Sequence, residues 1–369
     1  MTARRVAVVI TRLEGGAGVW ALRAIRAVPP EECEVTLVCG SGGRLLDEAV
    51  SAGVPTVVEP SLRPTIAAGH DLLAWWRLCE LFDRERFDVV HTHCAKAGAV
   101  GRLAARRCRT PRIVHTFHGF PFHDFQRAPR HRGYVEVERR LGRMTDVALC
   151  VGSGVAAEAV RRRLIAPERV RTVGVPVDRD TTRADPRSRE RARLLLGLSP
   201  ESVVVGAVGR WTYQKAPEDF AAAVRALGRP VEGVWIGGRP GPSSELLSAD
   251  VPVRWVEDRE DVAQLLPAFD VFALPSRYEG LPLAVVEAMV CGVPVVATAV
   301  NAVPDVVLPG ETGLLVPPER PELLASAIAH LLDHPERAAR MAARARERVP
   351  GCCDTAALAR SLTAAYLGP

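Results

Sequence analysis

Short apolar runs alternate with segments of helical period along the whole chain. In the first half the runs are RVAVVI, EVTLVCG, PTVVEP, FDVVHTH, RIVHTFHG, DVALCVG and VRTVGVP, separated by stretches such as DLLAWWRLCELFDRER. The second half repeats the pattern through VVVGAVGR, VEGVWIGG, VPVRWV, DVFALPS, PVVATAV and TGLLVPP. Strands and helices in repeated succession predict parallel sheets covered on both faces. We therefore expect an α/β fold of two doubly wound, Rossmann-like domains that face each other across a cleft.

The domain boundary is expected where this rhythm breaks. Residues 178–200 are charged, contain prolines and are poor in β-branched residues. A chain of 369 residues is also long for one hydrophobic core. We expect an N-terminal domain (1–177), a linker (178–200), a C-terminal domain (201–348) and a C-terminal helix (349–369), which in one arrangement crosses back to the first domain.

Composition excludes several classes of protein. With 48% hydrophobic and 25% charged residues the chain is globular, and no run approaches the roughly 20 apolar residues of a membrane span. The opening MTARRVAVVI lacks a signal-peptide pattern, and the nine cysteines fit a reducing compartment, so we expect a cytoplasmic protein. A net charge of +5 is too mild to suggest a nucleic-acid partner.

Ligands of open parallel sheets bind where strands end in loops that lead to helices. The first such loop carries Gly15 and Gly16, whose backbone could approach a phosphate closely at the start of a helix near Val19. The pattern is not the G-x-G-x-x-G dinucleotide fingerprint, which argues against a nicotinamide oxidoreductase. A tight turn that needs glycine explains this segment equally well.

The loop after VVVGAVGR carries Gly209, Arg210 and Lys215. Only two of the 48 basic residues are lysines, Lys96 and Lys215, so composition alone does not explain a lysine in this loop. A guanidinium fork and an ammonium five residues apart can converge on a diphosphate. A solvated surface pair is the less favoured alternative.

The most informative segment runs from Pro275 to Thr298. It leaves the strand DVFALPS, turns at Glu279, Gly280, Leu281 and Pro282, and enters a helix that contains Glu287. Proline is tolerated in the first turn of a helix. Two spaced carboxylates there suit sugar and ribose hydroxyls, and the turn's N–H groups suit phosphate or sugar oxygens.

Glu279-x7-Glu287 followed by Gly292-x-Pro294-x-Val-Ala-Thr298, together with Gly209-Arg210 and Lys215, resembles the retaining GT-B glycosyltransferases of family four, the glycogen-synthase-like group. The resemblance covers nearly the whole chain. It implies a nucleotide-sugar donor domain in the second half and an acceptor-side domain in the first.

Site roles follow from this resemblance. Arg210 and Lys215, beside Gly209, would bind the departing diphosphate, Glu287 the ribose, and Glu279 with the turn from Gly280 to Pro282 the transferred sugar. In the first domain Gly15 and Gly16 would close on the distal phosphate, and His118 in HTFHG would contact the sugar. The implied catalytic residues are His118, Arg210, Lys215 and Glu279.

Neighbouring histidines raise the alternative of a metal site. His91, His93, Cys94, His115 and His123 lie close in sequence, but their spacing does not match a closed zinc set. We expect no metal and no cofactor. Lys96, after the strand FDVVHTH, suits either the acceptor side or a structural salt bridge.

Two segments leave the acceptor and the base open. Residues 126–144 carry six arginines, with Tyr134, Val137, Leu141 and Met144 at helical intervals. Such a helix could rest on an anionic membrane, although an apolar stripe in the core with solvated arginines is slightly favoured. The loop at 255–259 departs from the family pattern, so the base is less defined than the diphosphate. Val175-Pro-Val-Asp178 also departs from it, which implies a different backbone geometry at the hinge.

The predicted function is therefore retaining, metal-independent hexosyl transfer from a nucleotide-diphosphate sugar, UDP-sugar first and GDP-sugar next. The acceptor is a hydroxyl of a lipid-linked glycan or small molecule, in the cytoplasm or at the inner membrane face. The alternatives are another GT-B sugar-nucleotide enzyme, such as an epimerase or hydrolase, and a non-catalytic nucleotide-sugar-binding subunit.

Overall fold

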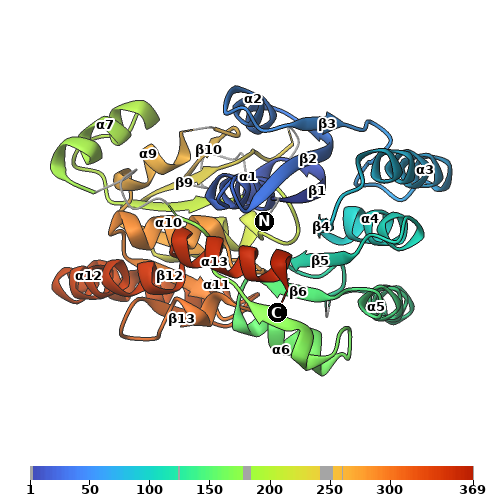
Figure 1. Cartoon of the computed structure of the whole chain (residues 1–369). Helices are drawn as coiled ribbons and strands as arrows, with labels where there is room; N and C mark the ends of the chain where they lie inside the picture. The colour runs from blue at the N-terminus through green and yellow to red at the C-terminus, as the bar shows by residue number, and fades with distance from the viewer. Residues whose placement is uncertain (1–2, 124, 178–183, 242–251, 260, 369) are drawn as a thin grey trace. The chain divides into compact units, whose positions relative to one another are not determined.

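The computed structural model describes residues 3–368 apart from residues 124, 178–183, 242–251 and 260. The chain divides into two compact units (Figure 1). One comprises Met1–Pro176 with Asp354–Pro369, and the other comprises Val177–Cys353. Each unit is built on one parallel sheet, and each apolar run noted in the sequence overlaps one of its strands. The predicted pair of doubly wound domains is confirmed.

The first unit has a seven-stranded sheet in the order β3-β2-β1-β4-β5-β6-β7. Its strands are β1 (Arg4–Leu13), β2 (Cys33–Gly42), β3 (Thr56–Val58), β4 (Val89–His93), β5 (Arg112–Phe117), β6 (Val147–Cys150) and β7 (Val170–Thr172). The helices between them are α1 (Gly15–Ala27), α2 (Arg44–Ser51), α3 (Ala68–Glu85), α4 (Ala95–Arg107), α5 (Ala128–Gly142), α6 (Ser153–Arg161) and the 3₁₀ turn η1 (Pro167–Arg169).

Apolar residues on both sides of the strands hold this unit together. Ala7 and Val9 of β1 join a cluster with Leu78 of α3 and Val100 of α4. Val6 and Val8, which alternate with them, are also buried, as expected when helices cover both faces of a parallel sheet. Strand β1 is therefore apolar on both faces, whereas β4 and β5 also bury polar residues such as His91, Thr92 and His115.

The last helix of the chain, α13 (Thr355–Leu367), belongs to the first unit and packs beside α1 (Figure 1). It begins at Asp354, whose side chain accepts hydrogen bonds from the N–H groups of Ala356 and Ala357. The hydroxyl of Tyr366 lies 2.7 Å from His91 Nδ1, so the helix is joined to β4 by a buried polar contact.

The second unit has a six-stranded sheet in the order β10-β9-β8-β11-β12-β13. Its strands are β8 (Val204–Val208), β9 (Glu232–Ile236), β10 (Val253–Val256), β11 (Val271–Leu274), β12 (Val295–Thr298) and β13 (Leu314–Val316). Its helices are α7 (Pro186–Leu196), α8 (Pro217–Ala226), α9 (Val262–Leu265), η3 (Leu266–Ala268), α10 (Leu283–Cys291), η4 (Val303–Asp305), α11 (Pro321–Asp333) and α12 (Pro335–Cys352). Phe220, Trp235, Val271 and Ile328 join one buried cluster on this sheet.

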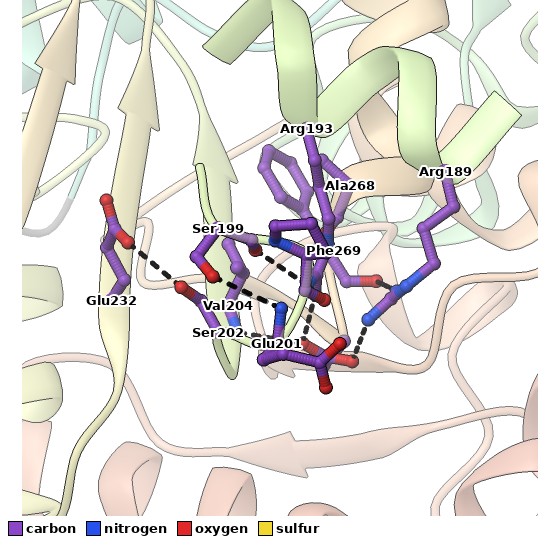
Figure 2. A network of polar contacts seen from close by, with 11 residues as sticks. Arg189, Arg193, Ser199, Glu201, Ser202, Val204, Glu232, Ala268 and Phe269 are labelled. Carbon is purple, nitrogen blue, oxygen red and sulfur yellow. Dashed lines mark hydrogen bonds and ion pairs between the residues drawn. The ribbon is translucent and has the colours of Figure 1, made fainter. Parts of the chain in front are cut away.

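Helix α7 differs from the expected linker. Residues 178–183 lie outside the described residues, but 186–196 form a helix that starts at a reciprocal Asp185–Ser188 capping box and ends at left-handed Gly197. Figure 2 shows the side chains of Arg189 and Arg193 on this helix. Arg193 Nη2 lies 3.0 Å from Asp270 Oδ2, and Arg189 Nη2 lies 2.5 Å from Asp270 Oδ1. Two arginines of this charged segment therefore hold the helix to Asp270, which lies directly before β11 in the same unit.

Candidate functional site

Each sheet has a point where successive strands are added on opposite sides. In the second unit this switch lies between β8 and β11, and in the first unit between β1 and β4. Loops diverge there at the carboxyl ends of parallel strands, so ligands commonly bind at such points. The segments directly after these four strands contain Gly15 and Gly16, Lys96, Lys215 and Glu279, whereas His118 follows β5.

In the second unit the switch point joins two predicted site residues directly. Lys215, in the loop after β8, places Nζ 2.5 Å from Oε1 of Glu279, in the loop after β11. Glu279 is 7% exposed and Lys215 is half-buried. A buried carboxylate is costly unless it is paired, so each of these charges depends on the other.

Neighbouring amides hold this pair in place. Gln214 Nε2 donates to the Tyr278 carbonyl at 3.0 Å and lies 3.4 Å from Oε2 of Glu279. The Glu279 N–H donates to Asn301 Oδ1 at 3.2 Å. Both carboxylate oxygens of Glu279 therefore face a donor from the loop after β8.

Glycines let the loop after β8 approach the sheet closely. A Cβ at Gly209 would lie 3.1 Å from the Lys215 side chain, so the lysine stem packs against this glycine. Arg210 follows directly and is exposed. The sequence analysis missed Gly237 and Gly238, which have φ of +117° and +127°; a Cβ at Gly237 would meet the Gly209 carbonyl at 2.6 Å. The glycine pair that ends VEGVWIGG was the sequence feature that could have identified them.

The remaining predicted donor residues surround the start of α10. The Gly280 carbonyl accepts a hydrogen bond from the Ala302 N–H at 3.3 Å, and Pro282 caps the helix. Leu281 is half-buried between them. Glu287 is half-buried within the helix, eight residues beyond Glu279. The turn thus presents its backbone at a helix N-terminus, as the sequence predicted.

Arg277 is a functional candidate that the sequence analysis did not identify. It is 8% exposed, and its guanidinium contacts Tyr213, Glu218, Asp219 and Glu319. The signal was an arginine inside the most informative segment, two residues before Glu279. Figure 2 shows the contrasting network of Arg193, a buried arginine whose partners Ala268 and Ser199 lie outside these loops.

In the first unit the glycine loop lies at the end of β1. Helix α1 begins at Gly15, four residues earlier than expected, and Gly15 has φ +60°. Gly15 and Gly16 are both exposed and belong to the first turn, where N–H groups lack intrahelical acceptors. The loop therefore offers backbone donors.

His118 follows β5 at the same edge of this sheet. Its Nε2 lies 2.9 Å from His93 Nδ1, and the Trp20 ring contacts it edge-on with centroids 5.1 Å apart. Burial lowers the pKa of His118 to about 3. A neutral imidazole results, which can donate or accept a hydrogen bond but carries no positive charge at neutral pH.

The other histidines of this group are held by polar neighbours. His91 contacts Tyr366 and Thr116, and His115 Nδ1 lies 2.8 Å from Thr92 Oγ1. Burial lowers the pKa of His91 to about 3 and that of His93 and His115 well below the usual range. Among the described residues no group of three or more His, Cys, Asp or Glu side chains is arranged to hold a metal ion.

Lys96, the second lysine, forms an ion pair with Asp71 of α3. Its side chain is 15% exposed. This contact supports the salt-bridge interpretation of Lys96, which the sequence had left level with an acceptor role.

Helix α5 contains the basic segment for which a membrane contact was considered. Leu141 is buried, Tyr134 and Met144 are half-buried, and Val137 is 47% exposed. The stripe therefore divides between core and surface. No helix within the described ranges has the length and apolarity needed to cross a bilayer.

Comparisons with known proteins cover both units. A family model described as Glycosyltransferase Family 4 matches residues 14–181, and one described as Glycosyl transferases group 1 matches residues 202–334. The two matches include the candidate loops of both sheets.

Three similar proteins illustrate the relationship. An Escherichia coli UDP-Gal:alpha-D-GlcNAc-diphosphoundecaprenol alpha-1,3-galactosyltransferase is 28% identical, with 76% of this chain and 75% of that protein aligned. A Corynebacterium efficiens D-inositol 3-phosphate glycosyltransferase is 31% identical, with 76% and 71% aligned. The crystal structure of Anabaena HepE in complex with UDP and glucose superposes with a TM-score of 0.83 at 18% identity, covering 97% of this chain and 98% of that one. This likeness shows a shared fold, the GT-B fold expected from the sequence.

Proposed function

Because the chain belongs to the family four glycosyltransferases and so uses a nucleotide sugar as donor, we propose that it transfers a hexose from a UDP-sugar to an acceptor hydroxyl with retention of configuration. The printed name of the E. coli relative contains UDP-Gal, and the similar Anabaena structure contains UDP and glucose. These two names support UDP ahead of GDP.

The observation that carries the proposal is the Lys215–Glu279 ion pair at the switch point of the second sheet. In the proposed site the Lys215 ammonium bridges Glu279 and the donor diphosphate, and Arg210 binds the same diphosphate from the exposed side of the loop. When the bond between the anomeric carbon and the phosphate oxygen breaks, negative charge develops on the leaving group. Fixed cations stabilise that charge without reorganisation.

Other residues bind the rest of the donor. Glu287 takes the ribose hydroxyls, and Glu279 with Gly280, Leu281 and Pro282 takes the sugar. Gly209 lets the backbone approach the diphosphate. Glu279 is engaged with Lys215, which suits a binding group better than a nucleophile.

In the first unit the residues proposed to bind a donor are Gly15, Gly16 and His118. Its exposed Gly15 and Gly16 offer backbone N–H groups to the distal phosphate. His118 offers an imidazole that its low pKa keeps neutral, which suits a hydrogen bond to a sugar hydroxyl.

Metal independence is part of the proposal. Two cationic side chains in one loop, Arg210 and Lys215, neutralise the charge that a divalent ion would otherwise neutralise. The reaction is then expected to proceed in the presence of a chelator, with no cofactor.

The acceptor is proposed to be a lipid-linked glycan or a small molecule. The names of the E. coli and C. efficiens relatives contain a diphosphoundecaprenol-linked sugar and an inositol phosphate, which represent these two classes. A lipid-linked acceptor would place the protein at the cytoplasmic face of a membrane, with the arginines of α5 toward anionic headgroups. The acceptor-side role that the sequence offered for Lys96 stays the alternative to its ion pair with Asp71.

The test is a titration of the purified protein with UDP-, GDP-, ADP- and dTDP-sugars, with and without EDTA, followed by donor hydrolysis. We expect a UDP-sugar to bind with the same Kd in both buffers. Tighter binding of another nucleotide sugar would correct the base, a requirement for a divalent ion would refute metal independence, and absence of binding would refute the donor site.

A further inference from the structure

We infer that Arg277 is a positioning residue of the donor site, which holds the loop of Lys215 and the loop of Glu279 in their working arrangement. The inference rests on the proposed donor site and adds a residue to it. Arg277 acts through its neighbours and is not proposed to touch the donor.

The Arg277 guanidinium contacts four neighbouring residues. Arg277 Nη1 donates to the Tyr213 carbonyl at 2.8 Å and to Glu218 Oε1 at 2.7 Å. Nη2 lies 3.3 Å from Asp219 Oδ1, and Nε lies 3.1 Å from Glu319 Oε1. The guanidinium also lies over the Tyr213 ring, with Cζ 4.3 Å from the centroid. Its fork thus joins the loop after β8, the start of α8 and the segment after β13.

Backbone hydrogen bonds next to these contacts join the same two loops. The Arg277 N–H donates to the Gln214 carbonyl at 2.8 Å, directly before Lys215. The Gln214 side chain returns a hydrogen bond to the Tyr278 carbonyl, directly before Glu279. Residues 213–215 and 277–279 are therefore joined by hydrogen bonds in both directions. The Lys215–Glu279 ion pair lies directly beside these hydrogen bonds. A movement of either loop would change the position of the ammonium.

The Arg277 guanidinium also balances the negative charge of its neighbours. Glu218, Asp219 and Glu319 all contact the Arg277 guanidinium. Without that cation three carboxylates would remain near the loop that is proposed to bind a diphosphate. Their repulsion would loosen the loop and disfavour an anionic ligand, because like charges at short range destabilise one another.

The specific expectation concerns donor affinity. Arg277→Gln removes the charge and the fork, so we expect the UDP Kd to rise by about tenfold or more, the factor that corresponds to the loss of one hydrogen bond to a charged group. Arg277→Lys keeps a charge without the planar fork, so its affinity should fall between those of Arg277→Gln and the wild type. The part of this effect that acts through the position of Lys215 should disappear in a Lys215→Ala background, so Arg277→Gln should raise the UDP Kd by a smaller factor there than in the wild type.

A matched control is available in the same unit. Arg193 of α7 is also buried, at 3% exposure, and donates to the backbone carbonyls of Ala268 and Ser199 and to the Asp270 carboxylate. Arg193→Gln should destabilise the fold in the same manner and leave donor affinity unchanged in the folded protein.

The experiment is titration of UDP into wild type, Arg277→Gln, Arg277→Lys, Arg193→Gln, Lys215→Ala and the Lys215→Ala/Arg277→Gln double variant, at a temperature where circular dichroism shows each to be folded. We expect a Kd increase of about tenfold or more for Arg277→Gln, a smaller one for Arg277→Lys and none for Arg193→Gln. An unchanged Kd in both Arg277 variants, or equal losses in the Arg277 and Arg193 variants, would overturn the inference. If Arg277→Gln does not fold, the Arg277→Lys result decides. Absence of UDP binding by the wild type would instead refute the proposed donor site.

Discussion

Lys215 Nζ lies 2.5 Å from Glu279 Oε1, although the two residues are 64 positions apart in the chain. They meet because β8 and β11 are neighbours in the sheet and both loops leave its carboxyl edge. Two motifs that the sequence offered as separate binding groups therefore form one charged pair. Loss of either side chain would leave the other charge partly buried and unpaired.

Replacing Gly237 by alanine should damage the donor loop. Gly237 has φ +117°, and an added Cβ would lie 2.6 Å from the Gly209 carbonyl oxygen. Strain and overlap together should cost about 2 to 3 kcal/mol of unfolding free energy and weaken UDP binding. Urea denaturation and titration measure the two effects.

Gly241→Ala is the matched control for this change, because a Cβ there meets nothing within 4 Å. Its stability should stay within about 0.5 kcal/mol of the wild type. Equal behaviour of the two alanine variants would contradict the close approach at Gly237.

Stability should fall on acidification through the histidines of the first unit. Burial lowers the pKa of His118 from 6.5 to about 3, so between these values the unfolded chain binds a proton that the folded chain does not. Unfolding free energy therefore rises with pH across this window, by about 1.4 kcal/mol per pH unit for each such histidine. Below about 3 and above 6.5 the contribution is constant.

The measurement is urea denaturation from pH 6.5 to pH 5 for the wild type and His118→Gln. His118→Gln should reduce the pH dependence of the unfolding free energy by about one proton. A wild-type slope in His118→Gln would show that His118 titrates normally in the folded protein.

Lys96→Ala and Asp71→Asn should behave alike. Their side chains form one ion pair between α4 and α3, so either change should lower the unfolding free energy by about 1 kcal/mol and leave the UDP Kd unchanged. Thermal denaturation and titration test this. An increase in acceptor KM for Lys96→Ala alone, with no loss of stability, would assign the lysine to the acceptor side instead.

The fold was predictable because it follows from the hydrophobic periodicity of the sequence and from the lengths of its apolar runs. Every strand overlaps an apolar run that the sequence displays, and buried parallel strands leave little ambiguity. Helix α7 was missed because its apolar residues gather at its C-terminal end, and its arginines contact Asp270, a residue about 80 positions away. Local composition does not contain such a contact.

The candidate site was predictable only where local motifs mark it. Lys215, Glu279 and Gly209 follow strands at recognisable positions, but their direct contact depends on strand order. Arg277 was missed because burial of a charged side chain depends on partners such as Glu319, 42 residues away. The start of α1 at Gly15 was missed because glycine usually argues against a helix interior.

The central claim is that Lys215 binds the donor diphosphate, and UDP titration of Lys215→Ala beside Arg254→Ala tests it most directly. Arg254 is exposed and paired with Glu232 at 2.7 Å in the same unit, so its removal deletes one positive charge and one ion pair away from the donor loops. We predict a Kd increase of roughly 10- to 100-fold for Lys215→Ala and a change below about twofold for Arg254→Ala. Wild-type UDP affinity in Lys215→Ala would contradict the account.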